Sequence, residues 1–192
     1  MRVTREQAEK NHQAVINMAS RLFREYGFDG IGLKDLMQGV GLTQGGFYKQ
    51  FSSKKDLTVQ ASQRALETAA QRWKRVMAAK PEATTTALVD FYLSSQHRAE
   101  RRDGCPMVAL GSDVMRQDSE VKAVFESGIV EHLDLIAQSL TDVDEADRAE
   151  RAKVMLATMV GALMLSRIVN DKKLSQSLLD TAAQEVKDLA AR

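Results

Sequence analysis

Apolar residues recur at helical spacing along nearly the whole chain, and this pattern most narrows the range of possible folds. Between Val15 and Tyr26 the apolar residues fall at positions i, i+3, i+4, i+7, i+8 and i+11, which form one face of a helix. Similar stripes continue as far as Leu189, and no segment shows the sustained alternation of a half-buried strand. The sequence therefore predicts an all-α protein of about nine helices.

Glycines and aromatic residues are concentrated near the N-terminus. Seven of the 11 glycines lie between Gly27 and Gly46, and six of the ten aromatic residues lie between residues 23 and 51. Ser53 followed by Asp56 resembles a capping box, which would start a long helix that continues to about Ala79. We therefore expect a three-helix domain over residues 1–55 and a larger helical domain over residues 56–192.

Composition excludes several classes of protein. The single cysteine excludes a disulfide framework and a four-ligand zinc site built from cysteine. The chain is 44% hydrophobic and carries 27 basic and 26 acidic residues, which is typical of a folded protein and gives no overall reason to expect nucleic acid. No signal peptide is evident, and the longest uncharged apolar stretch spans 13 residues where a membrane helix needs about 20. We expect a cytoplasmic protein with no membrane partner.

The segment from residue 31 to residue 57 carries the strongest functional signal. Two short amphipathic stretches are joined by a glycine-containing turn, which is typical of a helix-turn-helix whose second helix enters the major groove of DNA. A helical hairpin that binds no DNA has the same general pattern and stays an alternative. The second stretch places small or polar residues where bases would lie: Gln44, Gly45, Gly46 and Lys49. Thr43, Tyr48 and Lys54 flank them as hydrogen-bond donors suited to phosphate oxygens, whereas Phe47 and Phe51 face the core.

The run Gly41-Leu-Thr-Gln-Gly-Gly-Phe-Tyr-Lys-Gln-Phe-Ser-Ser-Lys-Lys-Asp-Leu57 resembles the N-terminal domain of TetR/AcrR-family transcriptional repressors. The preceding helix, which ends Ala19-Ser-Arg-Leu-Phe-Arg-Glu-Tyr-Gly27, resembles that domain too. The resemblance implies a two-domain homodimer that blocks transcription until a small ligand binds its C-terminal domain. It also implies roles for individual residues: phosphate contacts for Thr43, Tyr48 and Lys54, base proximity for Gln44, Gly45 and Gly46, and a DNA contact for Lys34.

The sequence departs from the family pattern at two places. Gly45 and Gly46 leave few side chains to bond to bases, so a contact from Gln44 to adenine is the best single expectation. Gly32 stands before the second helix, where Thr or Ser is usual in the family. Local charge agrees with DNA binding in sign, because residues 1–60 carry nine basic and six acidic residues whereas residues 61–192 carry 18 and 20.

The C-terminal part is expected to hold the effector pocket and the dimer interface. Six of the nine methionines lie at residue 77 or later, and flexible thioethers suit a pocket for apolar ligands, although methionine at this spacing is also ordinary core. The predicted pocket residues are Trp73, Phe91, Tyr92, Phe125 and Met159. The last two helices carry small residues that permit close approach, and the resemblance implies that they pair across a two-fold axis. They could instead only close the core of one protomer.

Cys105 lies between Arg101-Arg102 and the helix that begins at Pro106. Cations and a helix N-terminus both lower the pKa of a thiol, so a reactive thiolate sensor is one prediction. The Gly104-Cys105 element resembles one in a TetR subgroup, some members of which sense electrophiles or oxidants through cysteine. The alternative is a buried cysteine that packs at the start of a helix.

Catalytic and metal-binding patterns are weak. The three histidines are far apart, and the pair His97 and Glu100 is expected to lie on a solvated helix face, so no metal and no cofactor are predicted. The sequence thus predicts a ligand-responsive repressor, not an enzyme, that binds a pseudo-palindromic operator as a homodimer and is released by a small apolar or electrophilic effector. The alternatives are a thiol enzyme centred on Cys105 and a helical small-molecule carrier without DNA binding.

Overall fold

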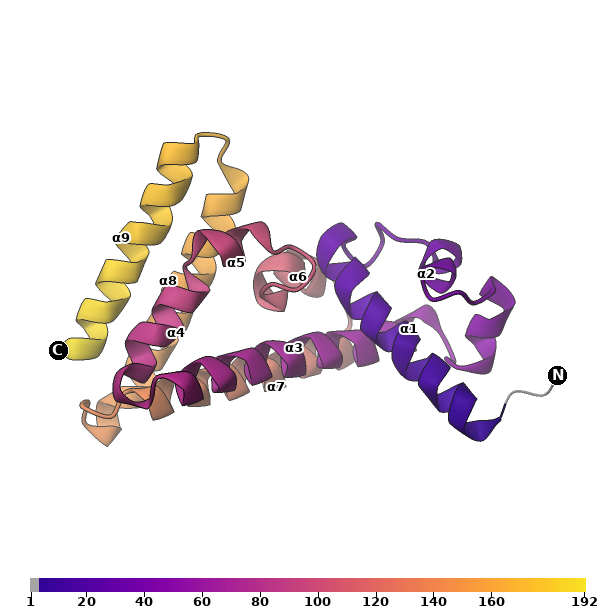
Figure 1. Ribbon diagram of the computed structural model, residues 1–192, viewed down its shortest axis with the longest axis horizontal. Helices are drawn as coiled ribbons and strands as arrows, with labels where there is room; N and C mark the ends of the chain where they lie inside the picture. The colour runs from indigo at the N-terminus through magenta and orange to yellow at the C-terminus, as the bar shows by residue number, and fades with distance from the viewer. Residues whose placement is uncertain (1–3) are drawn as a thin grey trace.

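The computed structural model describes residues 4–192, and all regular structure within that range is helical. Figure 1 shows a helical head at the N-terminal end of the chain beside a longer helical body. The nine α-helices of the described residues are α1 (Arg5–Tyr26), α2 (Leu33–Gly39), α3 (Lys54–Ala79), α4 (Thr84–Tyr92), α5 (Ser95–Ala99), α6 (Pro106–Val114), α7 (Ser119–Ser139), α8 (Glu145–Ile168) and α9 (Lys172–Ala191). Two 3-10 helices, η1 (Gln44–Lys49) and η2 (Pro81–Ala83), complete the set. The prediction of an all-α fold is confirmed.

The head consists of α1, α2 and η1. Gly27 ends α1 with a φ of 80°, and its N–H donates to the carbonyl of Phe23 at 2.8 Å. A side chain at this position would be strained by the positive φ, and its Cβ would lie 2.7 Å from a carboxylate oxygen of Asp113 on α6. Glycine at residue 27 therefore both turns the chain and lets the head approach the body closely.

One apolar cluster holds the head together and joins it to the body. Phe47 and Phe51 are buried and stacked, with ring centroids 5.4 Å apart, as expected for residues that face the core. The same cluster includes Leu57 of α3, Leu110 of α6 and Phe125 of α7. The predicted division at residue 55 stays a prediction, since the head shares this core with three helices of the body; residues 1–3 lie outside the described part of the chain.

The body is built on two long helices, α3 and α7, which lie side by side beneath α4, α6 and the α8–α9 pair in Figure 1. The close approach of α3 and α7 depends on Gly128, where an added Cβ would lie 2.6 Å from a methyl group of Leu66. A second apolar cluster fills the space among α3, α4, α7, α8 and α9, with Trp73, Tyr92 and Met159 buried within it.

The helix boundaries correct two details of the sequence-based description and add two others. The third helix of the head is a 3-10 helix. The segment after η2 forms two helices, α4 and α5, because the Ser94 hydroxyl accepts the N–H of His97 and starts α5. Asp118 caps α7 by accepting two N–H groups of its first turn. Only half of the expected capping box forms at α3: Ser53 accepts the N–H of Asp56 at 3.0 Å, whereas the Asp56 carboxylate bonds to Ser52.

Candidate nucleic-acid interface and ligand cavity

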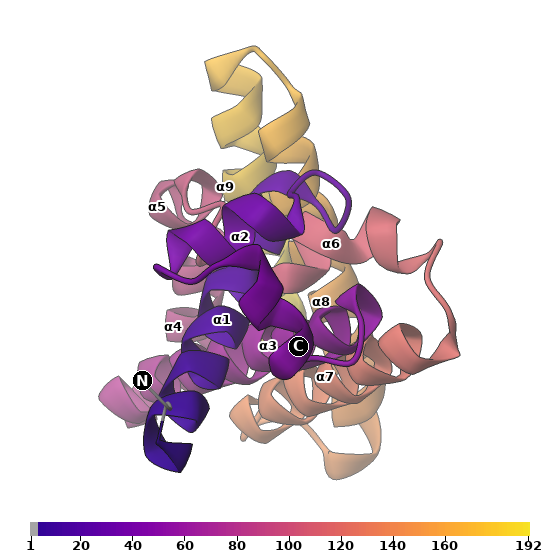
Figure 2. The same cartoon turned by 90° about the vertical axis from the view of Figure 1, so that its right-hand side faces the viewer.

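The predicted DNA-contacting residues belong to α2, to η1 with its N-cap Thr43, and to the first residue of α3. The head faces the viewer in Figure 2. The exposed residues of this set are Lys34, Thr43, Gln44, Gly45, Tyr48 and Lys49. Gly46 and Lys54 are partly buried. Tyr48 is 68% exposed although it is aromatic, while its neighbour Phe47 is fully buried. The head therefore presents the whole predicted set on or close to its surface, which is the arrangement that contact with a large partner requires.

The local structure of η1 explains which of these residues can reach a partner. Tyr48 packs edge-on against Phe47, with ring centroids 5.1 Å apart, and this contact directs its hydroxyl away from the core. Thr43 caps η1 with extended backbone angles and no side-chain capping bond. Gly45 has no atom within 4 Å of a hypothetical Cβ, so packing does not require glycine there. Gln44 and Lys49 are therefore the exposed side chains of η1, besides Tyr48, that are free to contact a partner.

The positive charge of this surface is largely uncompensated. Lys54, with a side chain 36% exposed, lies 3.3 Å from a carboxylate oxygen of Asp29, which is itself almost fully exposed. Among the described residues, Lys34 and Lys49 form no ion pair. An exposed pair such as Lys54–Asp29 contributes little stability and can be exchanged for a phosphate contact.

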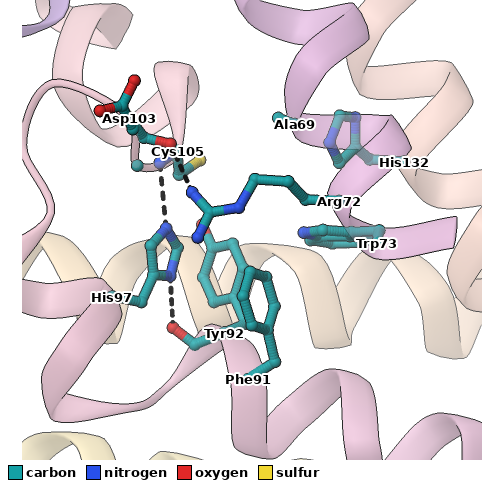
Figure 3. A pocket seen from close by; sticks show the side chains of 10 residues that line it. Ala69, Arg72, Trp73, Phe91, Tyr92, His97, Asp103, Cys105 and His132 are labelled. Carbon is teal, nitrogen blue, oxygen red and sulfur yellow. Dashed lines mark hydrogen bonds between the residues drawn. The ribbon is translucent and has the colours of Figure 1, made fainter. Parts of the chain in front are cut away.

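Three predicted pocket residues and the predicted sensor Cys105 come together inside the body. Trp73, Phe91, Tyr92 and Cys105 line one cavity, into which Figure 3 also shows His97, His132 and Arg72 projecting. The cavity offers only about 10 Å³, which is close to the minimum that holds one water molecule. It is therefore an aromatic packing site with no room for a drug-sized ligand.

His97 is the polar centre of this cavity, and its expected position on a solvated helix face is wrong, because its side chain is buried with 4% exposure. The N–H of Cys105 donates to Nε2 of His97 at 3.0 Å, so Nε2 must be unprotonated. The proton then sits on Nδ1, which donates to the carbonyl of Tyr92 at 2.7 Å. Burial lowers the pKa of His97 to about 4, and the cations Arg167 and Arg72 act in the same direction. Both ring nitrogens are thus occupied by backbone groups.

The thiol of Cys105 is 6% exposed, and burial raises its pKa above the ordinary value. The Tyr92 hydroxyl, the N–H groups of Val108 and Met107 and the Arg167 charge act in the opposite direction without reversing the shift. The predicted lowering of the thiol pKa by a helix N-terminus and neighbouring cations is therefore wrong in its net direction. The Tyr92 hydroxyl is fully buried near this thiol but forms no hydrogen bond of good geometry in the described structure. No base is free to activate Cys105, which weighs against the thiol-enzyme alternative.

Phe125 and Met159 are not part of the Cys105 cavity. Phe125 lines a separate apolar groove of about 520 Å³ between α6, α7 and α8. Met159 is fully buried in the second core cluster and lines neither space. The later methionines do not gather around one pocket either, since Met107 and Met115 line the groove whereas Met155 and Met159 are buried in the core.

Sequence reasoning missed three arginines that hold residues 97–104 in place. Arg24 of α1 donates to the Gly104 carbonyl at 3.0 Å, and Arg72 of α3 donates to the Asp103 carbonyl at 2.6 Å. Arg167 of α8 donates to the carbonyls of His97, Arg98 and Glu100 at 2.8–3.0 Å. No local sequence pattern predicts these contacts, because the three donors are far apart in the chain. Arg24 connects the head directly to the segment that carries Cys105.

Within residues 4–192, no group of three or more His, Cys, Asp or Glu side chains is arranged to hold a metal ion. Over the same part of the chain, no helix combines the length and the apolar character that crossing a membrane would need.

Comparison with known proteins agrees with this arrangement of head and body. Residues 15–61 match the family model described as bacterial regulatory proteins, tetR family, and residues 81–184 match the C-terminal domain of LmrA/YxaF-like transcriptional regulators. An uncharacterized HTH-type transcriptional regulator, YezE of Bacillus subtilis, is 27% identical over 116 residues. That match spans 58% of this chain and 59% of the length of YezE, which is less than two thirds.

Solved structures share the fold over nearly the full length. A TetR transcriptional regulator from Chloroflexus aurantiacus is 25% identical, with a TM-score of 0.77, and the match covers 97% of this chain and 95% of that one. Escherichia coli NemR in its reduced form is 21% identical, with a TM-score of 0.78 and coverage of 93% and 96%. At this lower identity, the second similarity establishes the fold alone.

Proposed function

This chain belongs to the TetR family of bacterial regulatory proteins, and on that premise we propose that it is a homodimeric repressor that a small apolar effector releases from its operator. The family is one of DNA-binding transcriptional regulators. The operator, the dimer and the effector response are the finer elements of the proposal. We also place its action in the cytoplasm, where the bacterial chromosome lies.

The observation that carries DNA binding is the exposed surface of the head. Gln44 and Lys49 are exposed beside the glycine pair of η1, so the backbone of this short helix can approach base edges. Thr43, Tyr48 and Lys54 flank it with hydroxyl and ammonium donors for phosphates, which fix register without reading sequence. A dimer would place two such surfaces about 34–36 Å apart, or a multiple of that distance, on a pseudo-palindromic site.

Dimerisation is supported by unpartnered apolar residues on α8 and α9. Leu165 and Ile168 are 46% and 66% exposed, and Leu174 of α9 is 50% exposed. A groove between the two helices includes Gly161, which has no atom within 4 Å of a hypothetical Cβ. A second copy that covers these apolar groups removes them from water, which lowers the free energy of the pair. Two-fold pairing uses the same face of both protomers.

Release from DNA requires that an effector favour a conformation in which the two heads no longer match the operator. The contacts of α6 with the head supply a route: the Asp113 carboxylate accepts the N–H of Phe28 at 3.2 Å, and it touches Gly27. Arg24 adds a second link to the Gly104 carbonyl. Movement of α6 or of residues 100–104 would therefore move the head.

We favour an apolar, non-covalent effector over an electrophile. An electrophile would have to reach the Cys105 thiol, which is buried and has a raised pKa, so little thiolate is present at neutral pH. Cys105→Ser should therefore respond to the natural inducer as the wild type does. Loss of the response in this variant would restore the thiol-sensor prediction.

DNA binding can be tested by fluorescence anisotropy with DNA from upstream of the protein's own gene. Lys49→Ala and Lys54→Ala should weaken binding and reduce the slope of log affinity against log salt by about one unit each, because each removes one phosphate or base contact. Lys80→Ala is the matched control, since Lys80 is an exposed lysine at the C-cap of α3, the end of that helix far from the head in Figure 1. Unchanged slopes in both head variants would contradict the proposed interface.

The dimer can be tested by sedimentation of charge-introducing variants. Ile168→Glu should shift the protein to a monomer, because two carboxylates would be buried in a two-fold apolar interface. Val130→Glu is the control, since Val130 is 51% exposed on α7, outside the α8–α9 face. A monomeric wild type, or a dimer unaffected by Ile168→Glu, would refute this interface.

A further inference from the structure

The groove between α6, α7 and α8 differs from the Cys105 cavity in size and in chemistry. Its volume of about 520 Å³ lies within the range of about 300–1,000 Å³ that is typical of small-molecule sites. Its wall includes Met107, Phe125 and Leu156, and the lining residues are apolar with the exception of Lys153. Met115 stands at the groove with 71% of its surface exposed, so a flexible apolar side chain is available to close over an occupant.

Gly111, in the middle of α6, lines this groove. Its φ is not positive, since Gly27 and Gly41 are the positive-φ glycines among the described residues. A hypothetical Cβ on Gly111 would have no atom within 4 Å, so no close packing demands glycine. Glycine inside a helix costs about 1 kcal/mol relative to alanine. What its absent side chain provides is open space in the α6 wall of the groove.

Lys153 defines the polar end of the groove. Its ammonium lies 2.5 Å from a carboxylate oxygen of Glu150, and the two side chains are 59% and 76% exposed. An exposed pair three residues apart on one helix is weak, so the Lys153 ammonium can turn to another anion at little cost. The groove thus combines a long apolar wall with one cation.

We propose that this groove binds an amphipathic small molecule with an apolar body and a single anionic group, the apolar part against α6 and the anion at Lys153. The inference that this groove is the effector site rests on the proposed function. The inference that it binds such a molecule does not depend on DNA binding. An occupant would press on the helix whose Asp113 holds Phe28 and touches Gly27, so its binding acts directly on the junction with the head. The Cys105 cavity, with about 10 Å³, is too small for this role.

The test uses two fluorescent probes with the same ring system. 8-Anilinonaphthalene-1-sulfonate carries the apolar body and one anion, and N-phenyl-1-naphthylamine lacks the anion. The full-length protein should bind one sulfonate probe per chain, and decanoate should displace it. Lys153→Gln should weaken the sulfonate probe about threefold to tenfold and change the neutral probe less than about twofold, because only the charge contact is lost.

Filling the groove provides the second arm. Gly111→Leu should weaken both probes by about tenfold or more, whereas Gly111→Ala, which adds one methyl group to the same open space, should keep most of the affinity. Ile129→Glu gives an independent measurement from α7 if the leucine variant melts early, since Ile129 lines the groove and is 38% exposed. It should weaken the sulfonate probe through charge repulsion.

Several outcomes would overturn the proposal. One is that neither Gly111→Leu nor Ile129→Glu changes the affinity for the sulfonate probe. Another is that Lys153→Gln changes the affinities for both probes equally. If the wild-type dimer does not bind the probe and Gly111→Leu weakens the dimer, the groove is an interface with a second copy of the chain. Promoter binding measured on the same variants separates the two proposals, because a wild type that binds the probe but no DNA refutes only the proposed function.

Discussion

Acidification from about pH 7.5 to about pH 5.0 should cost the folded chain roughly 2 kcal/mol through His97 alone. His97 is buried, its Nε2 accepts the N–H of Cys105, and burial lowers its pKa to about 4. A proton on Nε2 would break that hydrogen bond and place a cation near Arg72 and Arg167. The folded protein therefore keeps this imidazole neutral at pH values where the unfolded chain protonates it.

The sign and size follow from proton linkage. The unfolded histidine has a pKa of about 6.5 and the folded one about 4, so the unfolded state binds more protons between these values and stability falls as pH falls. The contribution is fully present above about pH 6.5 and is lost progressively towards about pH 4. The complete shift corresponds to about 3 kcal/mol, of which about 2 kcal/mol is lost by pH 5.0. His132, whose pKa is also lowered by burial, adds to the loss in the same direction.

The assay is urea unfolding followed by circular dichroism at the two pH values, at one fixed protein concentration. His97→Gln serves as the reference, because glutamine cannot titrate but can still accept a hydrogen bond. The variant will be less stable than the wild type at neutral pH, but its loss on acidification should be smaller by about 2 kcal/mol. Equal losses in the two proteins would refute the assignment of a neutral, hydrogen-bonded His97.

Three further changes should alter stability by known mechanisms. Gly128→Ala should cost about 1–3 kcal/mol in thermal or urea unfolding, because its methyl group would overlap the buried Leu66 side chain and make Leu66 repack or α3 shift. Arg24→Met should cost about 1–3 kcal/mol by leaving the Gly104 carbonyl without this donor, and it should raise hydrogen exchange at the end of α1. Asp118→Ala should cost about 1 kcal/mol by uncapping α7, with a melting temperature unchanged from the wild type as the contrary result.

The head was largely predictable because its determinants are local. The period of α1, its end at Gly27 and the inward positions of Phe47 and Phe51 all follow from residues close together in the chain. The 3-10 geometry of η1 did not follow, since a six-residue segment with two glycines has little intrinsic preference between helix types. Apolar spacing also does not reveal the break between α4 and α5. That break depends on one hydrogen bond, which the N–H of His97 donates to the Ser94 hydroxyl.

The cavity was predictable only in part because apolar periodicity shows that a side chain faces inward but not what it meets there. Trp73, Phe91 and Tyr92 line one small cavity, whereas Met159, which follows the same apolar pattern, is sealed in the core. An effector-binding role for these residues stays a prediction. His97 is polar and short of partners in the sequence, so a solvated position was the natural expectation. Its partners are backbone groups of Tyr92 and Cys105, which the fold of the segment between α4 and α6 brings to the two ring nitrogens.

By itself, the sequence determined the all-helical fold and the family, because these depend on spacing within single helices and one short motif. The tertiary structure alone decided the rest. Arg24, Arg72 and Arg167 converge on one segment from three distant helices, burial reverses the expected direction of the Cys105 pKa, and Gly111 borders open space where α6 lies beside α7 and α8. The physical reason is common to all three: hydrogen bonding, desolvation and open space depend on neighbours that helix packing brings together.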